Sequence, residues 1–146
     1  RLLEAELPPS LIALTVQREV AERICAAPPE MSLLAVSVQL YGKARVAGYI
    51  PADAFYPKPK VDSAIVRIDL FDQPPLGGAE AGRFFELVKA GFSQKRKQIK
   101  NALAAGLKMK GSEAEALLLS AEIDPSRRAE TLTLEEWKRL FGRLVK

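Results

Sequence analysis

A proline-rich segment between two strand-like stretches is the strongest constraint on how this chain can fold. Residues 55–63, FYPKPKVDS, place prolines at positions 57 and 59. Each proline fixes φ at about −65° and biases the preceding residue toward extended backbone, so the segment cannot become helical. Apolar, β-rich sequence lies on both sides, at 45–50 and 61–70. The pattern predicts a stiff arch that joins two strands.

The arch carries an aromatic ring and cations, which it would present at one end of a sheet. They are Phe55, Tyr56, Lys58 and Lys60. This combination suits a flat, anionic ligand such as a nucleotide. The alternative is that Phe55 is a core residue and that the prolines only end the two strands.

Composition limits the chemistry that the chain can perform. One cysteine and no histidine among 146 residues exclude a disulfide framework, a Cys/His metal site and an imidazole base. No motif supports a carboxylate metal site, and no apolar run is long enough for a membrane span, so we expect no metal, no membrane and a cytoplasmic location. The net charge is +4. The excess is concentrated between positions 92 and 111, which hold no acidic residue and six basic ones, Lys95, Arg96, Lys97, Lys100, Lys108 and Lys110.

The first half of the chain reads as alternating strands and helices, the pattern of an α/β domain. Residues 1–7 resemble the end of a helix, and the apolar run at 10–17 predicts a strand buried on both faces of a parallel sheet. Helices are expected over 18–27 and 31–41. Strands are expected over 43–50 and 61–70, with Ala64, Val66, Ile68 and Leu70 on one face.

The second half is expected to be a small bundle of short helices. The sequence DQPPLGG at 72–78 is the clear linker, so we predict one domain over 1–72, a linker over 73–78 and a helical domain over 79–146. Helix starts are expected at Ser93, at Ser112 with Glu115, and at Thr133 with Glu136. A helix beginning at Ser93 would place Arg96, Lys97 and Lys100 on one face.

Four blocks in this sequence, in the same order, resemble the ribosomal RNA adenine dimethyltransferases. They are VQREVAER at 16–23, the arch FYPKPKVDSA at 55–64, FSQKRKQIKNAL at 92–103, and the segment from Ile123-Asp124-Pro125 to Leu132. One departure is the sequence MSLLA at 31–35, where the family usually has Tyr-Gly-Arg-Leu-Ser. The resemblance implies the C-terminal part of a Rossmann-like methyltransferase sheet, followed by a small all-α RNA-binding domain.

The resemblance also shows what these residues lack. Members of the family bind S-adenosylmethionine with a glycine-rich first turn and an acidic residue, and hold the target amine with an Asn-Leu-Pro-Tyr segment. None of these motifs occurs at 1–146. We therefore expect no cofactor-binding or catalytic residue in this chain, which alone should be inactive. A strand at 10–17 without its neighbours would also leave an open sheet edge, so self-association is expected.

What remains is a set of substrate-binding candidates. The resemblance implies that Phe55, with Pro57 and Pro59, forms one side of the pocket for the target adenine, because a π-face holds a base and leaves its edge free. The RNA-binding candidates are Lys60, Lys95, Arg96, Lys97 and Lys100. The predicted function of the complete protein is dimethylation of adjacent adenines in small-subunit ribosomal RNA during ribosome biogenesis. The alternative is a non-catalytic RNA-binding assembly or transcription factor of the same fold.

Overall fold

The computed structural model describes residues 2–146, so Arg1 lies outside the described residues. The chain divides into two compact units. The sheet unit holds the residues up to 26 together with 34–75, and the helical unit holds 27–33 together with 76–146. The short segment 27–33 was not expected in the helical unit, where the amide of Met31 donates to the carbonyl of Glu130 at 3.1 Å. The boundaries drawn at 72 and 79 stay a prediction.

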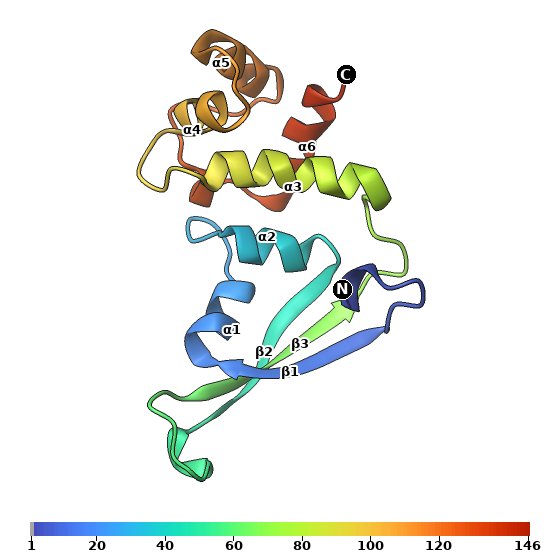
Figure 1. The fold of residues 1–146 in the computed structure, drawn as a ribbon, viewed down its shortest axis with the longest axis vertical. Helices are drawn as coiled ribbons and strands as arrows, with labels where there is room; N and C mark the ends of the chain where they lie inside the picture. The colour runs from blue at the N-terminus through green and yellow to red at the C-terminus, as the bar shows by residue number, and fades with distance from the viewer. Residues whose placement is uncertain (1) are drawn as a thin grey trace. The chain divides into compact units, whose positions relative to one another are not determined.

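Three strands form the sheet, and their arrangement confirms the α/β class but corrects one expectation (Figure 1). They are β1 (Leu11–Gln17), β2 (Gly42–Ile50) and β3 (Ser63–Leu70), in the order β1-β3-β2 with both pairs antiparallel. The strand at 10–17 was expected to be parallel and buried on both faces, which is wrong for the described chain. β1 lies at an edge with β3 as its neighbour, and its Leu11 and Leu14 are 40% and 39% exposed.

The two helices that the sequence predicted in this half of the chain are present and lie against the sheet. α1 (Arg18–Ile24) contacts all three strands, and α2 (Leu33–Gln39) contributes Val38 to the same core. The amide nitrogen of the Gln39 side chain donates to the carbonyls of Ile24 and Ala26, each at 2.9 Å, and so fastens α2 to the end of α1. The buried core of this unit consists of Ile12, Ala21, Ile24, Val38, Ala64, Val66 and Ile68.

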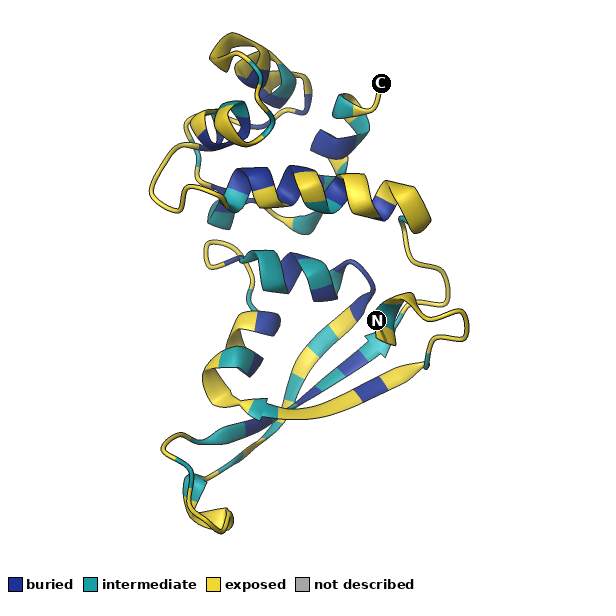
Figure 2. Ribbon diagram, viewed as in Figure 1, coloured by how far each residue is buried: buried dark blue, intermediate teal, exposed yellow. Residues whose placement is uncertain are grey.

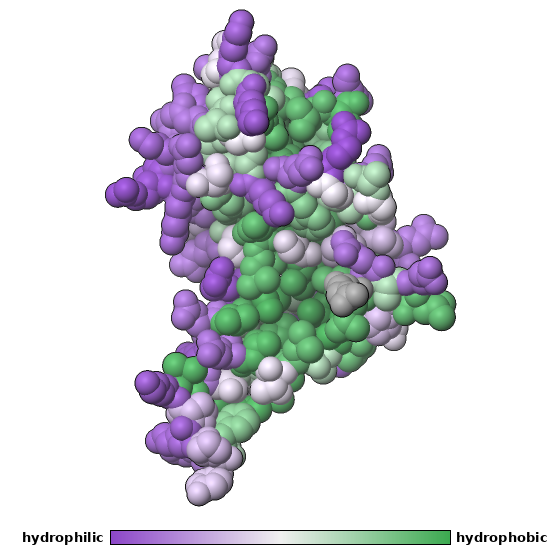
Figure 3. Space-filling view, in the orientation of Figure 1, coloured by the Kyte–Doolittle hydropathy of each residue, from purple (hydrophilic) through white to green (hydrophobic). Residues whose placement is uncertain are grey.

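The expected N-terminal helix is instead one short 3-10 turn, η1 (Leu2–Glu4). The prolines at 8 and 9 prevent a helix from continuing beyond Leu7. Around this turn and β1, apolar side chains form much of the visible surface of the sheet unit, drawn green in Figure 3.

The helical unit contains four α-helices around an aromatic and aliphatic core, as the dark inner faces in Figure 2 show. They are α3 (Gly78–Phe92), α4 (Ile99–Gly106), α5 (Gly111–Ser120) and α6 (Leu134–Leu144), with a 3-10 turn η3 (Ala129–Thr131) before α6. The ring of Phe84 meets that of Phe141 edge to face at 5.6 Å, and the ring of Trp137 lies 5.5 Å from that of Phe92.

Two of the three expected helix starts are wrong. Thr133 and Glu136 do cap α6, since the Glu136 amide donates to the Thr133 hydroxyl at 3.1 Å. α5 begins one residue before Ser112, and its first turn is closed by Glu113, which accepts from the Lys110 amide at 2.8 Å. Ser93 belongs to the end of α3, where its hydroxyl donates to the Ala90 carbonyl at 2.6 Å. Residues 93–98 are therefore a loop, and α4 begins only at Ile99.

Candidate RNA-binding site

The arch predicted from the prolines is present and joins β2 to β3. It opens with one 3-10 turn, η2 (Ala52–Ala54), because Pro51 can begin such a turn but not continue the strand. The amide of Ala54 donates to the Pro51 carbonyl at 3.0 Å, and the amide of Phe55 donates to the Ala52 carbonyl at 3.2 Å. The backbone at Phe55 is therefore held within the arch.

Asp62 connects the two ends of the arch by a hydrogen bond. Its Oδ1 accepts from the amide of Ala52 at 2.9 Å, across the base of the loop. Its own carbonyl accepts from the amide of Arg18, the first residue of α1, at 3.0 Å. Asp62 was not among the predicted site residues, although its place directly before a predicted strand, at the end of the arch, was a signal that could have identified it.

The aromatic side chains of the arch are exposed to solvent rather than buried. Phe55 is 38% exposed and Tyr56 is fully exposed. The interpretation of Phe55 as a core residue is therefore wrong for the described chain. Pro57 is exposed and Pro59 is half-buried.

The cations of the arch differ in their partners. Lys58 pairs with Asp53 at 2.5 Å, while Lys60 is exposed and makes no ion pair within residues 2–146. Nearby, the guanidinium of Arg18 lies 5.0 Å from the centre of the Tyr49 ring and binds Glu22 at 3.0 Å. The hydrogen bond and charge of Glu22 raise the pKa of Arg18, which stays a cation beside the arch.

In the helical unit, three of the predicted RNA-binding cations lie together on the loop between α3 and α4. Lys95, Arg96 and Lys97 are exposed, and none of them forms an ion pair in the described part of the chain. Backbone hydrogen bonds order this basic loop (residues 93–98). Within it, the Lys97 amide donates to the Gln94 carbonyl at 3.0 Å, and directly after it the Ile99 amide donates to the Arg127 carbonyl at 2.7 Å. Figure 3 shows hydrophilic side chains, in purple, along this side of the unit.

Lys100 is set apart from the other three. It lies on α4, one third exposed, with its Nζ 4.0 Å from a carboxylate oxygen of Glu115 on α5. The expectation that Arg96, Lys97 and Lys100 share one helical face is wrong, because the helix starts only after the first two. A loop can present its cations in several directions, which suits an irregular phosphate backbone.

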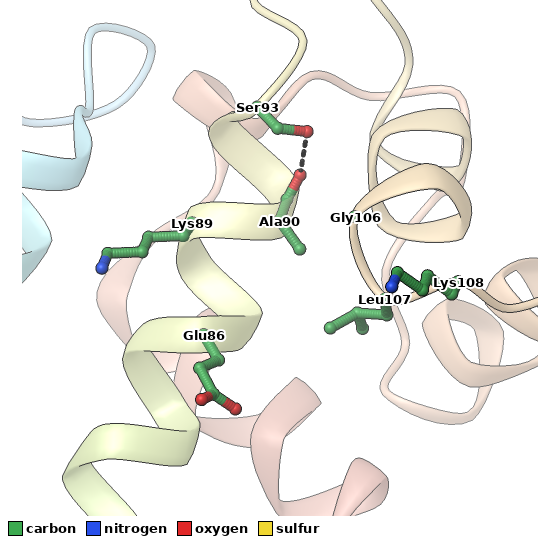
Figure 4. Close-up of a pocket in the computed structure, with 7 residues that line it drawn as sticks. All are labelled: Glu86, Lys89, Ala90, Ser93, Gly106, Leu107 and Lys108. Carbon is green, nitrogen blue, oxygen red and sulfur yellow. Dashed lines mark hydrogen bonds between the residues drawn. The ribbon is translucent and has the colours of Figure 1, made fainter.

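A shallow groove between α3 and α4 borders the basic loop (Figure 4). The helices approach closely because Gly106 lies against Ala90: an added Cβ at Gly106 would be 2.5 Å from the Ala90 Cβ. Leu107 points into the groove from one side, while the Lys89 side chain extends away from it. The charged residues of the lining are Glu86, Lys89 and Lys108.

The described residues contain no glycine-rich turn directly after a strand. The cofactor that the family implies needs such a turn, whereas β1 runs straight into α1 and the glycines at 77 and 78 begin α3. Residues 2–146 also contain no group of three His, Cys, Asp or Glu side chains placed to hold a metal ion. Within the same range, no helix is long and apolar enough to cross a membrane.

The fold, the arch and the basic loop together define a class of protein. Its members combine an α/β unit, whose sheet carries an arch with an exposed aromatic ring, with a helical unit that carries a basic loop. The sequence profile of the family "Ribosomal RNA adenine dimethylase" matches residues 1–146. The chain belongs to this family, as its motifs predicted.

Individual relatives agree with the family match. The "Ribosomal RNA small subunit methyltransferase A" of Dehalococcoides mccartyi is 45% identical over 140 residues, which cover 96% of this chain and 48% of the relative. The protein of the same name from Alkaliphilus oremlandii is 36% identical over 149 residues, covering 100% and 52%. The chain thus spans about half the length of the relatives it matches.

Two solved structures share the fold. The crystal structure of the 23S rRNA methyltransferase ErmE superposes with a TM-score of 0.72 at 28% identity, covering 99% of this chain and 58% of that one. A dimethyladenosine transferase from Plasmodium falciparum gives a TM-score of 0.76 at 23% identity, covering 95% and 59%. The second likeness shows the fold alone.

Proposed function

We propose that this chain is the C-terminal portion of an S-adenosylmethionine-dependent methyltransferase that dimethylates adjacent adenines of small-subunit ribosomal RNA. The observation that carries the proposal is the exposed ring of Phe55 on the arch, whose backbone is held by hydrogen bonds, in a chain of this family. The enzyme would act in the cytoplasm on the assembling small ribosomal subunit.

In this proposal, the arch forms one side of the pocket for the target adenine. The exposed face of Phe55 stacks on the base, and Pro57 and Pro59 keep the loop stiff enough to hold the ring in place. Stacking fixes the plane of the adenine and leaves its amino group free at the edge. Positioning of this kind needs no proton-transfer residue from the arch.

The basic loop supplies the contacts to the RNA backbone. Lys95, Arg96 and Lys97 have no acidic partner among the described residues to compete with phosphate, and Lys60 adds an exposed cation on the arch. The pair between Lys100 and Glu115 is long at 4.0 Å, so phosphate can displace the carboxylate at small cost. These contacts are independent of RNA sequence.

The methyl donor would be held by residues other than those described. S-adenosylmethionine supplies the methyl groups when it is bound, and this chain's part is to bind and orient the RNA. The chain alone is then inactive and has no measurable affinity for the cofactor.

Mapping of methylated adenines tests the proposal. Unmodified small ribosomal subunits are incubated with the full-length enzyme and S-adenosylmethionine, and the modified positions are read by mass spectrometry of nuclease fragments. We expect dimethyladenine at two adjacent positions. Modification of a single isolated adenine would contradict the choice of substrate, and no methyl transfer at all would contradict the enzymatic function.

A non-catalytic RNA-binding factor is the second candidate, because the described residues lack a cofactor turn. Under that function, the protein binds ribosomal RNA with the basic loop but transfers no methyl group even at full length. The same incubation, combined with a measurement of RNA binding, separates the two functions.

A further inference from the structure

Asp62 lies at the end of the sheet where β1 and β2 end and β3 begins. In the strand pairing, Ser63 lies opposite Gln17 at the end of β1 and opposite Ile50 at the end of β2. Asp62 directly precedes Ser63, so it is the last residue of the arch before β3 begins. From this position it bonds to both segments that leave the sheet there, α1 through the Arg18 amide and η2 through the Ala52 amide.

Two hydrogen bonds in series connect the Asp62 carboxylate to Phe55. The carboxylate accepts from the amide of Ala52 at 2.9 Å, and the carbonyl of the same Ala52 accepts from the amide of Phe55 at 3.2 Å. A bond from an amide to a carboxylate is stronger than one between neutral groups. The position of the Phe55 backbone therefore depends on a side chain that lies further along the chain and does not touch the ring.

The arch offers a second aspartate for comparison. The Asp53 side chain is 78% exposed and pairs with Lys58, which is itself 64% exposed. An exposed pair of this kind contributes little to the order of a loop. Asp62 is half-buried and spans the base of the arch, so the two aspartates on one loop should behave differently.

We propose that Asp62 is a positioning residue for the target adenine, acting through Ala52 to hold Phe55 at the angle at which its ring stacks on the base. This inference rests on the proposed role of Phe55. It concerns the geometry of the arch, because the carboxylate itself does not contact the base.

Amide hydrogen exchange of this chain tests the structural half of the proposal. In Asp62→Ala, the amides of Ala52 and Phe55 should exchange about tenfold faster or more, while those of β3 keep their rates and show that the sheet is intact. Asp62→Asn keeps an acceptor oxygen and should largely restore protection, and Asp53→Ala should change neither amide. Unchanged exchange at Ala52 and Phe55 in Asp62→Ala would overturn the proposal.

Steady-state methylation by the full-length enzyme tests the functional half. Asp62→Ala should lower kcat by about fivefold or more, without exceeding the loss caused by Phe55→Ala, and should change KM for RNA less than about twofold, since most of the affinity for RNA is expected from the basic loop. Asp62→Asn should recover most of kcat. Faster exchange in Asp62→Ala with an unchanged kcat would overturn the positioning role alone, provided that Phe55→Ala does lower kcat. If Phe55→Ala also keeps a normal kcat, the proposed role of the arch falls as well.

Discussion

Arg127 and Glu136 are joined by two parallel hydrogen bonds, from Nη1 to Oε1 at 2.6 Å and from Nη2 to Oε2 at 3.1 Å. The same Oε2 accepts from the Thr133 amide at 2.8 Å, so one carboxylate both caps α6 and fastens it to the turn after α5. These hydrogen bonds, led by those from Arg127, hold the pKa of Glu136 below its usual range.

The lowered pKa makes the stability of the helical unit depend on pH in a defined direction. A depressed carboxyl pKa stabilises the fold fully above the unfolded value of about 4.3, and this contribution is lost as the pH falls through the folded value. Glu136→Gln should reduce the free energy of unfolding at pH 7 by about 1–3 kcal/mol and flatten its decline below about pH 4.3. The measurement is urea unfolding at several pH values.

Glu135→Gln, which removes the ion pair with Lys138, is the control and should change stability by less than about 0.5 kcal/mol. Parallel pH profiles for the wild type and Glu136→Gln would contradict this account.

The sequence revealed this helix start because Thr133 and Glu136 form a local pattern. It did not reveal the partner of Glu136, since Arg127 lies in a turn and approaches only through the tertiary fold. The same limit explains Ser93 and Ser112. Both have the right chemistry for an N-cap. However, the hydroxyl of Ser93 donates back to the preceding helix, and the N-cap of α5 is Lys110, whose amide donates to the Glu113 carboxylate. Local sequence preference predicts the existence of a helix more reliably than it predicts the residue at which the helix starts.

Gly91 and Gly82 lie on the same helix, α3, but in opposite surroundings. A Cβ added at Gly91 would collide with Cη2 of Trp137, whereas one added at Gly82 meets nothing within 4 Å. Gly91→Ala should therefore destabilise the helical unit by about 1–3 kcal/mol through overpacking. Gly82→Ala should stabilise it by about 0.5–1 kcal/mol, because alanine favours the helix. Thermal unfolding compares the two variants, and a loss of stability in both, or in neither, would contradict the described packing.

Replacement of Lys95, Arg96, Lys97 and Lys100 by Ala should weaken RNA binding about equally for different RNA sequences. The dependence of log K on log salt should become shallower by about 0.7–0.9 for each phosphate that the variant no longer neutralises. Fluorescence anisotropy at several salt concentrations gives both values for this chain. Lys43→Ala combined with Lys138→Ala removes charges far from the basic loop in sequence and serves as the control. If the slope of the quadruple variant equals that of the wild type, the loop does not bind the RNA backbone.

The open edge of β1 should make this chain self-associate. Its seven residues, Leu11–Gln17, carry no charged side chain, and unpaired strand edges without charges tend to pair with another copy. Thr15→Lys places a charge on the exposed edge and should shift the chain toward a monomer in light scattering. Gln73→Lys adds the same charge outside the sheet and should leave the association unchanged. A monomeric wild type over the whole accessible concentration range would refute this prediction.

The candidate site was predictable to the extent that it rests on stiff local sequence. The prolines at 57 and 59 predicted the arch, because two fixed φ angles leave few conformations, but they left open whether Phe55 is exposed or part of the core. The hydrogen bond between Asp62 and Ala52 depends on which strands are neighbours, which sequence alone leaves open. The burial of β1 was misjudged for a related reason: an apolar strand indicates that it packs on both sides, but not which segment of the protein supplies the cover.

The most direct test of the central claim, that Phe55 holds the target adenine, is single-turnover methylation of unmodified small ribosomal subunits by full-length enzyme carrying Phe55→Ala. One stacked base contributes about 1–3 kcal/mol, so the rate of methyl transfer should fall by about 5- to 150-fold at saturating RNA. The affinity for the subunit, which depends mainly on the cations, should change less than twofold, and Phe55→Tyr should retain most of the rate. An unchanged rate in Phe55→Ala, or an equal loss of rate and affinity, would contradict the assignment of the arch to the adenine pocket.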